Sequence, residues 1–485
     1  MSTLQTPYRI SHWIGGLPVD DKNAVVIPNI NPATAVVIGE IPVASARVVD
    51  EAVQTAKNAF ISWSALPAET RAYWLNRLAD AIDAEMESLA LAETTDSGKP
   101  LWLSKKVDIP RASSNFRFFA AAATQFASES HSGPNTIDYT LRQPLGVVGC
   151  ISPWNLPLYL FTWKIAPALA AGNTVVAKPS EVTPTTAYLL GELMKRIGFP
   201  PGVLNIIQGD GPTTGESIVT HPEIKAVSFT GSTRAGQRIA SLLAPGLKKF
   251  SLELGGKNAA VIFADAEFDA MITETVRSSF TNQGEICLCT SRLLIEDSIY
   301  DRFRDAFIEK VKQLTIGDPL DEKTKQGALV SQTHFEKVSQ CVELAVEEGG
   351  RMLIGGQRFT AAGNCSGGFF YKPTVIEGLG PDTRTNQEEI FGPVVTLQRF
   401  KDEKEAIELA NASGYGLAAT VWTSELKKAH RVATALQTGI VWVNSWLYRD
   451  LRTPFGGVKN SGIGREGGWE AMRFFTEPKN ISIRF

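Results

Sequence analysis

Two helices are predicted near the start of the chain from the spacing of its apolar residues. The positions that recur at helical spacing are Val49, Ala52, Val53, Ala56, Phe60 and Trp63 in the first stretch, and Leu75, Leu78, Ala79, Ile82, Met86 and Leu89 in the second. Such spacing places the apolar side chains on one face of a helix. The second pattern ends near Gly98 and Pro100, which are residue types that stop a helix. Each stretch therefore predicts an amphipathic helix with one buried face.

The middle of the chain alternates between short apolar runs and helix-like segments. The runs rich in β-branched residues lie at 147–151, 174–178, 203–208, 226–230 and 259–263. Helical patterns such as "TPTTAYLLGELMKRIG" and "TRAGQRIASLLA" separate several of them. This order of strands and helices predicts a mostly parallel sheet with helices on its faces.

The alternation starts again after about residue 265, with strands predicted at "TVIEG", "PVVTLQRF", "AATVWT" and "GIVWVN". A second α/β domain is the simplest interpretation. The stretch 209–215, "GDGPTTG", is interpreted as a loop because a proline follows its two early glycines. The polar stretch 133–144 is predicted to form a two-stranded arm, and the tail "NISIRF" a strand that pairs with another segment.

The composition is that of an ordinary globular protein of two or three domains. The chain has 485 residues, of which 44% are hydrophobic and 20% charged, and its formal net charge is −3. A slightly acidic balance gives no electrostatic footprint for nucleic acid. The Lys and Arg residues are scattered, which does not favour an anionic membrane surface as a partner. No apolar stretch approaches the ~18 residues of a membrane span.

The cysteines and the first residues of the sequence predict a cytoplasmic protein. The five cysteines are Cys150, Cys287, Cys289, Cys341 and Cys365. A sparse, odd number of cysteines is typical of a reducing compartment. The start, "MSTLQTPYRISHWIGG", lacks the charged and apolar regions of a secretory signal.

Two of the cysteines, in "NQGEICLCTSR" at 282–292, are candidates for chemistry. A zinc site needs about four ligands, and none of the five histidines lies near this pair in the sequence, so no metal is expected. A redox pair usually has the spacing C-x-x-C. Two readings stay open: small buried residues, or a nucleophile that needs a partner base.

Two polar residues in apolar surroundings are candidate partners for a nucleophile. Asn155, in "SPWNLP", follows the first strand of the alternating region. An amide at that edge of a parallel sheet either stabilises an oxyanion or caps a turn. Glu253, in "LELGGK", lies within an apolar run. A carboxylate there either has a raised pKa and acts as a general base, or belongs to a structural ion pair.

Two further stretches are candidates for binding a nucleotide. Lys178 and Glu181, in "AKPSE", follow a predicted strand and suit sugar hydroxyls, although a solvated turn is the alternative. Gly231 and Ser232, in "SFTGSTRAG", lie between a predicted strand and a predicted helix. A helix N-terminus approached through a glycine is a ready phosphate site, but this stretch is not the G-x-G-x-x-G fingerprint.

The order of these motifs is more specific than any one of them. "SPWNLP", "KPSE", "FTGS", "LELGGK", "NQGEIC" and "EEIFGP" resemble the successive motifs of the aldehyde dehydrogenase superfamily, and "NPAT" and "PFGGVKNSGIGREGG" extend the resemblance over almost the whole chain. The implied fold is α/β. It has a Rossmann-type NAD-binding domain (1–122 and 145–254), a catalytic α/β domain (255–454), and a small β oligomerisation arm (123–144 and 472–485), with 455–471 connecting.

The resemblance implies a thiohemiacetal and thioester mechanism. Cys287 would be the nucleophile, and Cys289 would not. Asn155 and the backbone N–H of Cys287 would hold the oxyanion, and Glu253 would activate water. Where the family often has Gln two residues before the nucleophile, this chain has Glu285. A carboxylate close to Cys287 would raise the pKa of the thiol.

NAD is the cofactor that the resemblance implies. The positions that match its binding residues are Ser152, Trp154, Lys178, Glu181, Gly231, Ser232, Glu389 and Phe391. Lys178 and Glu181 match the adenine-side ribose position, and a glutamate there repels a 2′-phosphate, which favours NAD over NADP. Glu389 matches the residue that holds the nicotinamide ribose, and Phe391 one beside the ring.

Two arginines indicate the kind of aldehyde. Arg111, in "DIPR", and Arg449, in "WLYRD", lie in contexts most similar to those of the muconic semialdehyde dehydrogenases of this superfamily, where matching arginines bind the substrate carboxylate. The expected substrate is 2-aminomuconic 6-semialdehyde. 2-Hydroxymuconic semialdehyde, or a broader range of aldehydes with the arginines in structural ion pairs, is the alternative. Arg452 competes for the role given to Arg449.

Two other classes of function are less consistent with the sequence than a dehydrogenase. A cysteine hydrolase would need a base beside the thiol, and no histidine motif supports one. A non-catalytic descendant of the superfamily is disfavoured because Cys287, Glu253 and Asn155 are all present. The arm and tail resemble the superfamily's oligomerisation element, so a homodimer or homotetramer is expected.

Overall fold

The computed structural model describes residues 8–21 and 24–485. Its first large sheet has eight strands in the order β22, β12, β11, β8, β9, β10, β2, β3. Their bounds are Gly462–Ile463, Lys249–Glu253, Ile224–Thr230, Val147–Ile151, Thr174–Lys178, Leu204–Ile206, His12–Ile14 and Leu17–Val19. The strands from β12 to β10 run parallel, whereas β22, β2 and β3 join antiparallel. Because β9 and β11 lie on opposite sides of β8, the chain reverses its direction of progress there, which is where open α/β sheets bind ligands.

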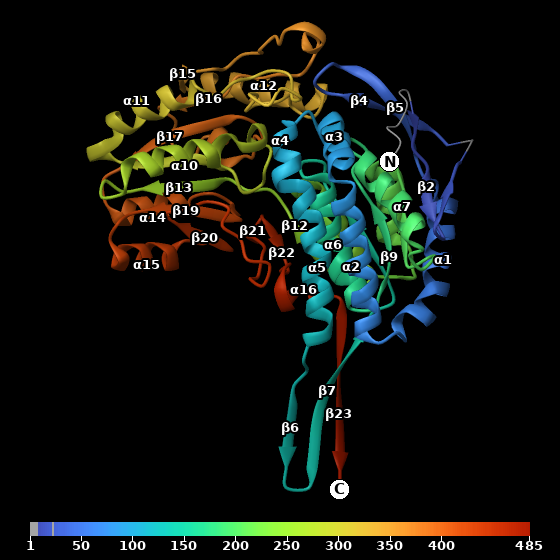
Figure 1. The fold of residues 1–485 in the computed structure, drawn as a ribbon. Coiled ribbons are helices and arrows are strands. Elements are labelled where there is room, and N and C mark those ends of the chain that lie inside the picture. The colour runs from blue at the N-terminus through green and yellow to red at the C-terminus, as the bar shows by residue number, and fades with distance from the viewer. Residues whose placement is uncertain (1–7, 22–23) are drawn as a thin grey trace.

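Helices cover both faces of this sheet, as predicted (Figure 1). One face packs against α2 (Ala68–Ala84), α5 (Ile109–Gln125), α6 (Pro157–Ala170) and α7 (Thr185–Ile197). The other packs against α1 (Ala46–Ser64), α8 (Glu216–Thr220) and α9 (Thr233–Leu243). Every residue of α6 is buried, so this helix passes through the core.

The second apolar pattern near the N-terminus spans two helices, which corrects the single helix predicted there. Glu85, with φ −115° and ψ 22°, separates α2 from α3 (Met86–Ser97). Leu89 of α3 still packs in the same core cluster as Leu75 of α2, which is why the pattern continues across the break. Helix α3 ends at Gly98, whose φ of +74° is left-handed and favours glycine.

The stretch 209–215 also differs from its prediction as a loop. Gly211–Gly215 forms one π-helical turn that leads into α8. The Asp210 carboxylate starts this turn by accepting hydrogen bonds from the backbone N–H groups of Thr213 and Thr214 at 2.7 and 3.4 Å. A short side chain that caps free N–H groups can stabilise a helical turn even in a glycine-rich segment.

The second large sheet has seven strands in the order β15, β16, β17, β14, β13, β19, β20. Their bounds are Arg351–Ile354, Thr374–Glu377, Val394–Phe400, Thr290–Glu296, Asn258–Ile262, Ala418–Trp422 and Ile440–Val443. All neighbours are parallel except β15 and β16. The four strands predicted in this half are β16, β17, β19 and β20. Helices α10 (Phe268–Phe280) and α11 (Tyr300–Val311) cover one face, and α14 (Glu403–Asn411) and α15 (Leu426–Ala435) the other.

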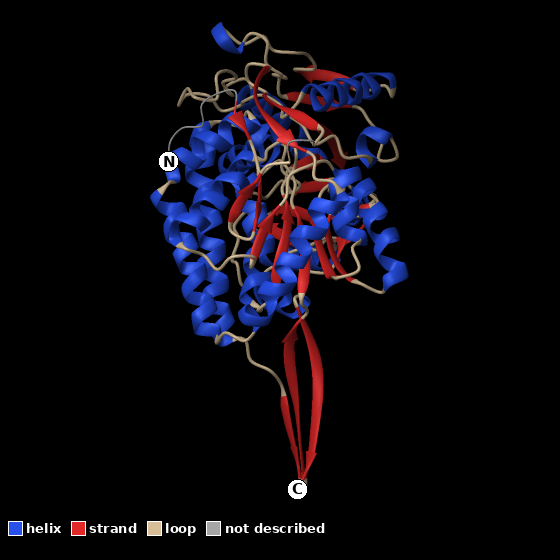
Figure 2. Ribbon diagram, turned by 90° about the vertical axis from the view of Figure 1, so that its right-hand side faces the viewer, coloured by secondary structure: helices blue, strands red, loops and turns tan. Residues whose placement is uncertain are grey.

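A three-stranded ribbon projects from the body of the molecule (Figures 1 and 2). It contains β6 (Ser130–Gly133), β7 (Thr136–Pro144) and β23 (Thr476–Arg484), with β7 in the middle. The predicted arm and the predicted C-terminal strand are thus one element, because β23 pairs antiparallel with β7 along its whole length.

The predicted boundary between residues 254 and 255 falls between β12 and β13, where the chain passes from one sheet to the other. The predicted connecting segment 455–471 returns β22 to the first sheet, against β12. The division into domains stays a prediction, and residues 1–7 and 22–23 of its first range lie outside the described residues. A small sheet of β1 (Tyr8–Arg9), β5 (Val36–Pro42) and β4 (Val26–Asn31) completes the N-terminal region. None of the described helices is both long and apolar enough to cross a membrane.

Candidate active site

The predicted site residues come from the two facing edges of the large sheets. Ser152, Trp154 and Asn155 follow β8, and Lys178 and Glu253 end β9 and β12. These positions share the carboxyl edge of the first sheet. Cys287 precedes β14 and Glu389 precedes β17, so both lie at the amino edge of the second sheet.

Hydrogen bonds join the two edges. The Asn155 side-chain amide donates to the Glu285 carbonyl at 2.9 Å, and the backbone N–H of Gly256 donates to Glu389 Oε1 at 2.8 Å. The fold thus brings together groups that are far apart in the sequence.

Cys287 and Cys289 face different surroundings although only one residue separates them. The Asn258 amide donates to the backbone carbonyls of Cys287 and Cys289 at 2.6 and 2.9 Å, which holds the loop. Cys289 is buried, and its thiol points at the carbonyl of Thr281. Cys287 is half-buried. Of the two thiols, that of Cys287 is therefore the more accessible.

The thiol of Cys287 is protonated in this site. Burial raises its pKa, and the nearby carboxyl groups of Glu389 and Glu253 raise it further, while Arg449 opposes them. Since the thiolate is the reactive form, Cys287 needs a base that accepts its proton. Among the described residues, no histidine hydrogen-bonds to it.

Asn155 is held firmly against the nucleophile loop. Its backbone carbonyl accepts hydrogen bonds from Lys99 Nζ at 2.8 Å and from the Asn282 amide at 3.1 Å. Its side-chain amide nitrogen carries two hydrogens and donates one of them to the Glu285 carbonyl. Among the described residues, the second hydrogen has no acceptor.

Glu285 does not direct a negative charge at Cys287. Its side chain accepts from the backbone N–H of Val330 at 3.1 Å and lies 3.6 Å from the His334 ring. Burial raises the pKa of this carboxyl well above its ordinary value, which favours the protonated form. In that form the carboxyl resembles the glutamine that the superfamily often has at this position.

Glu253 is a buried carboxyl with both oxygens unbonded. It is 3% exposed, and among the described residues neither oxygen has a hydrogen-bond partner. Burial and the carboxylate of Glu466 raise its pKa well above the ordinary value, while Lys164 opposes this shift. A carboxyl that is costly to ionise and free of partners is suited to accept and release a proton.

Lys164 and Glu466 are polar residues of the site that the sequence analysis missed. Lys164 Nζ donates to Glu466 Oε1 at 2.7 Å and to Ser228 Oγ at 3.2 Å, and all three side chains are buried. The signal was present, because Lys164 is the one charged residue of the fully buried helix α6. A buried lysine is rarely without a partner.

The candidate nucleotide residues line the same edge of the first sheet. Lys178 Nζ donates to Glu181 Oε2 at 3.1 Å and to the Gly209 carbonyl at 2.6 Å, so it fixes the Glu181 side chain. Ser232 caps the N-terminus of α9, where its Oγ accepts from the backbone N–H of Ala235. The Ser152 hydroxyl is buried without a partner among the described residues. A capped helix N-terminus, a carboxylate and an open hydroxyl suit a dinucleotide.

An aromatic cluster lies beside Glu389. The rings of Trp154, Phe391 and His334 meet with centroids 5.1 to 6.1 Å apart. His334 Nε2 lies 2.7 Å from the carbonyl of Phe391, which can only accept, so Nε2 carries the proton. Burial lowers the pKa of His334 to about 4, so the ring is neutral near pH 7.

The two predicted arginines converge on one tyrosine. Arg449 Nη1 donates to the hydroxyl of Tyr159 at 2.6 Å, and the guanidinium of Arg111 lies 5.7 Å from the centre of the same ring. Arg452 instead pairs with Asp450 and is 80% exposed, which removes it as a competitor for this place.

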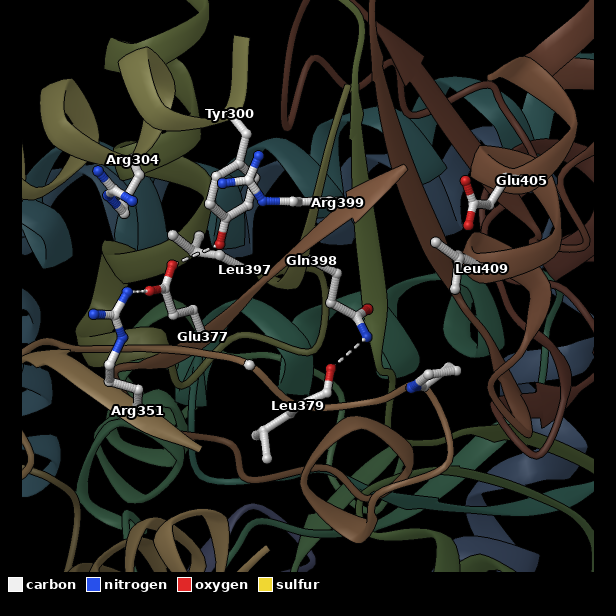
Figure 3. Close-up of a pocket in the computed structure, with 12 residues that line it drawn as sticks. Tyr300, Arg304, Arg351, Glu377, Leu379, Leu397, Gln398, Arg399, Glu405 and Leu409 are labelled. Atoms are coloured by element: carbon white, nitrogen blue, oxygen red, sulfur yellow. Dashed lines mark hydrogen bonds and ion pairs between the residues drawn. The ribbon is translucent and has the colours of Figure 1, made fainter. Parts of the chain in front are cut away.

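Size alone does not identify the site. A cavity of about 570 Å³ is lined by Tyr300, Arg351, Glu377, Gln398 and their neighbours on the second sheet (Figure 3). Its arginines are paired: Arg351 with Glu377, and Arg399 with Asp297 and Asp301. A much smaller hollow of about 20 Å³ is lined by Cys287, Cys289, Glu389 and Phe391. Of the two, only the hollow is lined by the predicted residues Cys287, Glu389 and Phe391.

A thiol at the edge of the second sheet, with a partnerless carboxyl and an amide donor at the edge of the first, is typical of a protein that acts on carbonyl groups through cysteine. The sequence matches the model of the aldehyde dehydrogenase family over residues 19–481. The chain belongs to the aldehyde dehydrogenase family. It is therefore an oxidoreductase that acts on aldehydes.

Two curated relatives and one solved structure illustrate the similarity. A 2-aminomuconic semialdehyde dehydrogenase of Mus musculus is 48% identical over 484 residues, which is 98% of each chain. A 2-hydroxymuconic semialdehyde dehydrogenase of Pseudomonas sp. (strain CF600) is 45% identical, over 98% of this chain and 99% of the relative. The betaine aldehyde dehydrogenase of Staphylococcus aureus, solved with NAD+, has a TM-score of 0.94 at 38% identity, over 97% of this chain and 94% of the other.

Proposed function

We propose that the protein oxidises an aldehyde to a carboxylic acid with NAD, through a thiohemiacetal and a thioester on Cys287. Bound NAD supplies the hydride acceptor. The thiol of Cys287 adds to the aldehyde carbon after giving up its proton, and Glu253 is the buried carboxyl suited to take it. After oxidation, Glu253 activates the water that releases the acid. The single observation that supports this most is the burial of Glu253 without partners near Cys287.

The oxyanion of both addition steps would be held by Asn155 and by the backbone N–H of Cys287. The free hydrogen of the Asn155 amide supports this role, because its other hydrogen holds the nucleophile loop. Removing one oxyanion donor typically lowers the rate ~100- to 1000-fold.

The cofactor residues are proposed on the same basis. Glu181 would accept hydrogen bonds from the adenine-side ribose, and its negative charge would repel the 2′-phosphate of NADP. Ser152, Gly231 and Ser232 would lie along the pyrophosphate and Glu389 at the nicotinamide ribose. Trp154 and Phe391 would pack near the ring. The relative solved with NAD+ supports NAD as the nucleotide.

The nucleophile is tested by comparing two single substitutions. Cys287→Ser should abolish NADH formation from an aldehyde, because a serine hydroxyl is a much weaker nucleophile than a thiolate. Cys289→Ser, the matched control, should retain it. The measurement is NADH absorbance under saturating NAD. An inactive Cys289→Ser with an active Cys287→Ser would reverse the assignment.

We further propose that the aldehyde carries a carboxylate, as in 2-aminomuconic 6-semialdehyde. Arg449 Nη2 is buried and has no partner among the described residues. An unpaired buried donor is unfavourable unless a ligand accepts its hydrogen bond. Arg111 has no ion pair among the described residues either, and it faces the same tyrosine. The names of the relatives support this substrate class. 2-Hydroxymuconic semialdehyde fits the same arginines, and they do not distinguish the two substituents.

The arginines are tested with matched aldehydes. Arg111→Ala or Arg449→Ala should raise the KM for a muconic semialdehyde about 10- to 100-fold, the range of a charged hydrogen bond. The KM for a small aliphatic aldehyde should stay within a factor of about two, since it carries no carboxylate. Arg452→Ala is the control and should change neither. Equal losses on both aldehydes would contradict the carboxylate role.

We also propose that the chain forms a homo-oligomer through the ribbon of β6, β7 and β23. The supporting observation is that the ribbon projects from the body with exposed apolar residues such as Leu141 and Ile483. A cytoplasmic location is proposed from the five cysteines, all of which are free thiols.

A further inference from the structure

Tyr159 occupies an unusual place for a residue of a core helix. It lies in the first turns of α6 and is 6% exposed. Its backbone carbonyl accepts from the Asn115 amide at 3.1 Å and from the Thr162 hydroxyl at 3.0 Å. These hydrogen bonds fix the backbone of Tyr159, so they also restrict the position of the phenol beside Arg449.

Arg449 is held by three side chains and still has free donors. Its guanidinium carbon lies 3.9 Å from the centre of the Phe455 ring and 4.6 Å from that of Trp163. Nη1 donates to the Tyr159 hydroxyl at 2.6 Å. Nη2 is buried and makes no hydrogen bond to any described residue. The two rings restrict the orientation of the guanidinium, so the direction of Nη2 is fixed before a ligand binds.

The hydroxyl of Tyr159 also has an unused donor. A phenol carries one O–H and can accept hydrogen bonds as well. Because Arg449 can only donate, the Tyr159 oxygen is the acceptor in their bond, and its own hydrogen is not used in it. Among the described residues, no acceptor for this hydrogen is present. A free O–H and a free Nη2–H therefore lie on adjacent groups.

We propose that Tyr159 is a specificity-determining residue that donates its O–H to the substrate carboxylate while orienting Arg449. This inference rests on the proposed function, since it assumes a carboxylate-bearing aldehyde. Two donors on adjacent groups match the two oxygens of one carboxylate, as in other bidentate recognition. Arg111, whose guanidinium lies 5.7 Å from the centre of the same ring, would add charge without replacing the phenol donor.

A neutral aldehyde gains nothing from this arrangement. It would leave Nη2 and the phenol hydrogen without acceptors in a buried place, which is unfavourable. The Tyr159 hydroxyl therefore should contribute to the preference between aldehydes and not to the chemistry at Cys287. Tyr159→Phe removes the hydroxyl and keeps the ring over which Arg111 lies.

The test compares kcat and KM of wild type, Tyr159→Phe and the control Tyr188→Phe, whose ring packs on Trp13 away from the site. Tyr159→Phe should raise the KM for a muconic semialdehyde about 10- to 100-fold, and change that for an uncharged aldehyde less than about two-fold. Tyr188→Phe should change neither. Unchanged preference in Tyr159→Phe, or an equal loss on both aldehydes, would overturn the inference. A wild type without preference for the carboxylated aldehyde would instead refute the proposed substrate class.

A second measurement detects the hydrogen bond directly, and its wild-type arm does not depend on the folding of a variant. Adipate is a saturated dicarboxylate that resembles the product in length and does not absorb in the near ultraviolet. Its binding to wild type and to Tyr188→Phe should produce a tyrosine difference spectrum, which Tyr159→Phe should lack. If adipate inhibits the wild type competitively without any tyrosine signal, the proposed hydrogen bond is absent.

Discussion

Glu285 illustrates how one buried residue can connect several segments of the site. Its backbone carbonyl accepts from the amides of Asn155 and Asn282, and its side chain accepts from Val330 N–H. The residue therefore ties the nucleophile loop both to the first sheet and to the segment before helix α12 (Gln332–Glu347). Burial, the largest cause, holds its pKa well above the ordinary value.

Replacing Glu285 by Gln should stabilise the protein increasingly as the pH rises. In the unfolded chain the carboxyl ionises near its ordinary pKa of 4.5. In the folded protein it stays protonated to higher pH, so the folded state loses stability, relative to the unfolded state, as pH rises above that value. Glutamine has no such loss. The Tm advantage of Glu285→Gln should be small near pH 4.5 and larger at pH 8.

The control for this measurement is Glu322→Gln, because the side chain of Glu322 is exposed. Differential scanning calorimetry from pH 5 to 8 would give both melting curves. A Tm difference for Glu285→Gln that shrinks with rising pH would mean that the buried carboxyl is ionised and stabilised in the folded protein. Glu285→Gln should also keep the activity of the wild type, since the charge of Glu285 takes no part in the mechanism.

At the scale of an element, helix α12 clamps the segment that precedes β17. His334 donates to the Phe391 carbonyl at 2.7 Å, and Lys337, one turn later, donates to the Glu389 carbonyl at 3.2 Å. Phe391 has a φ of +61°, a left-handed conformation that is unfavourable for a bulky residue. The clamp offsets that strain. The same segment carries the Glu389 carboxylate that bonds to Gly256.

Removing the hydrogen bond from His334 to the Phe391 carbonyl should weaken NAD binding. His334→Phe keeps an aromatic ring against Trp154 but cannot bond to the Phe391 carbonyl. The Kd for NAD, followed by tryptophan fluorescence, should rise about 2- to 10-fold, which is the net value of one hydrogen bond. Hydrolysis of an ester by the Cys287 thiol without NAD should be unaffected. His430→Phe, on the exposed side of α15, is the matched control.

The contrary result would be equally informative. If His334→Phe binds NAD as tightly as the wild type, the left-handed turn at Phe391 does not depend on α12. If ester hydrolysis falls in proportion to NAD binding, the ring supports the nucleophile loop rather than the segment 389–391.

At the scale of the whole molecule, the ribbon has two different faces. Because side chains alternate along a strand, Ile137, Tyr139 and Leu141 of β7 lie on one face. The register pairs Ile137 with Ile483 and Tyr139 with Ile481 of β23, and it pairs Leu141 with Lys479. The other face carries polar residues such as Asp138, Thr140 and Ser482. An apolar stripe on a projecting ribbon is suited to pack against another copy of the chain.

Charging the apolar stripe should disrupt the oligomer. The double variant Leu141→Lys and Ile483→Lys should have a lower mass by light scattering than the wild type, because burying two unpaired lysines in an interface is costly. The control Ile61→Lys places the same charge on α1, at a side chain that is 75% exposed, and should leave the mass unchanged. A wild-type mass for the double variant would show that the ribbon does not form the interface.

Local pattern was enough to predict much of the fold. The runs at 147–151 and 174–178 coincide with β8 and β9, because a short β-branched run in a parallel sheet is buried on both faces. The break at Glu85 could not be predicted, since the same apolar face continues across it. The sequence did not predict strands β12 and β14, because a charged residue lies in each, Glu253 and Arg292. Buried Arg292 is accommodated only because it donates to the carbonyls of Lys257, Leu409 and Ala410 in the fold.

The sequence by itself determined which residue types stand at the ends of the strands, and the order of its motifs indicated the family. Only the tertiary structure decided which side chains meet. Lys164 and Glu466 lie 302 positions apart in the sequence and are bonded in the fold, as are Tyr159 and Arg449, 290 positions apart. Spacing along a chain reports local geometry, whereas these contacts depend on how distant segments pack in the fold. That packing also raises the pKa values of Glu253, Glu285 and Cys287, because burial is a property of the folded molecule.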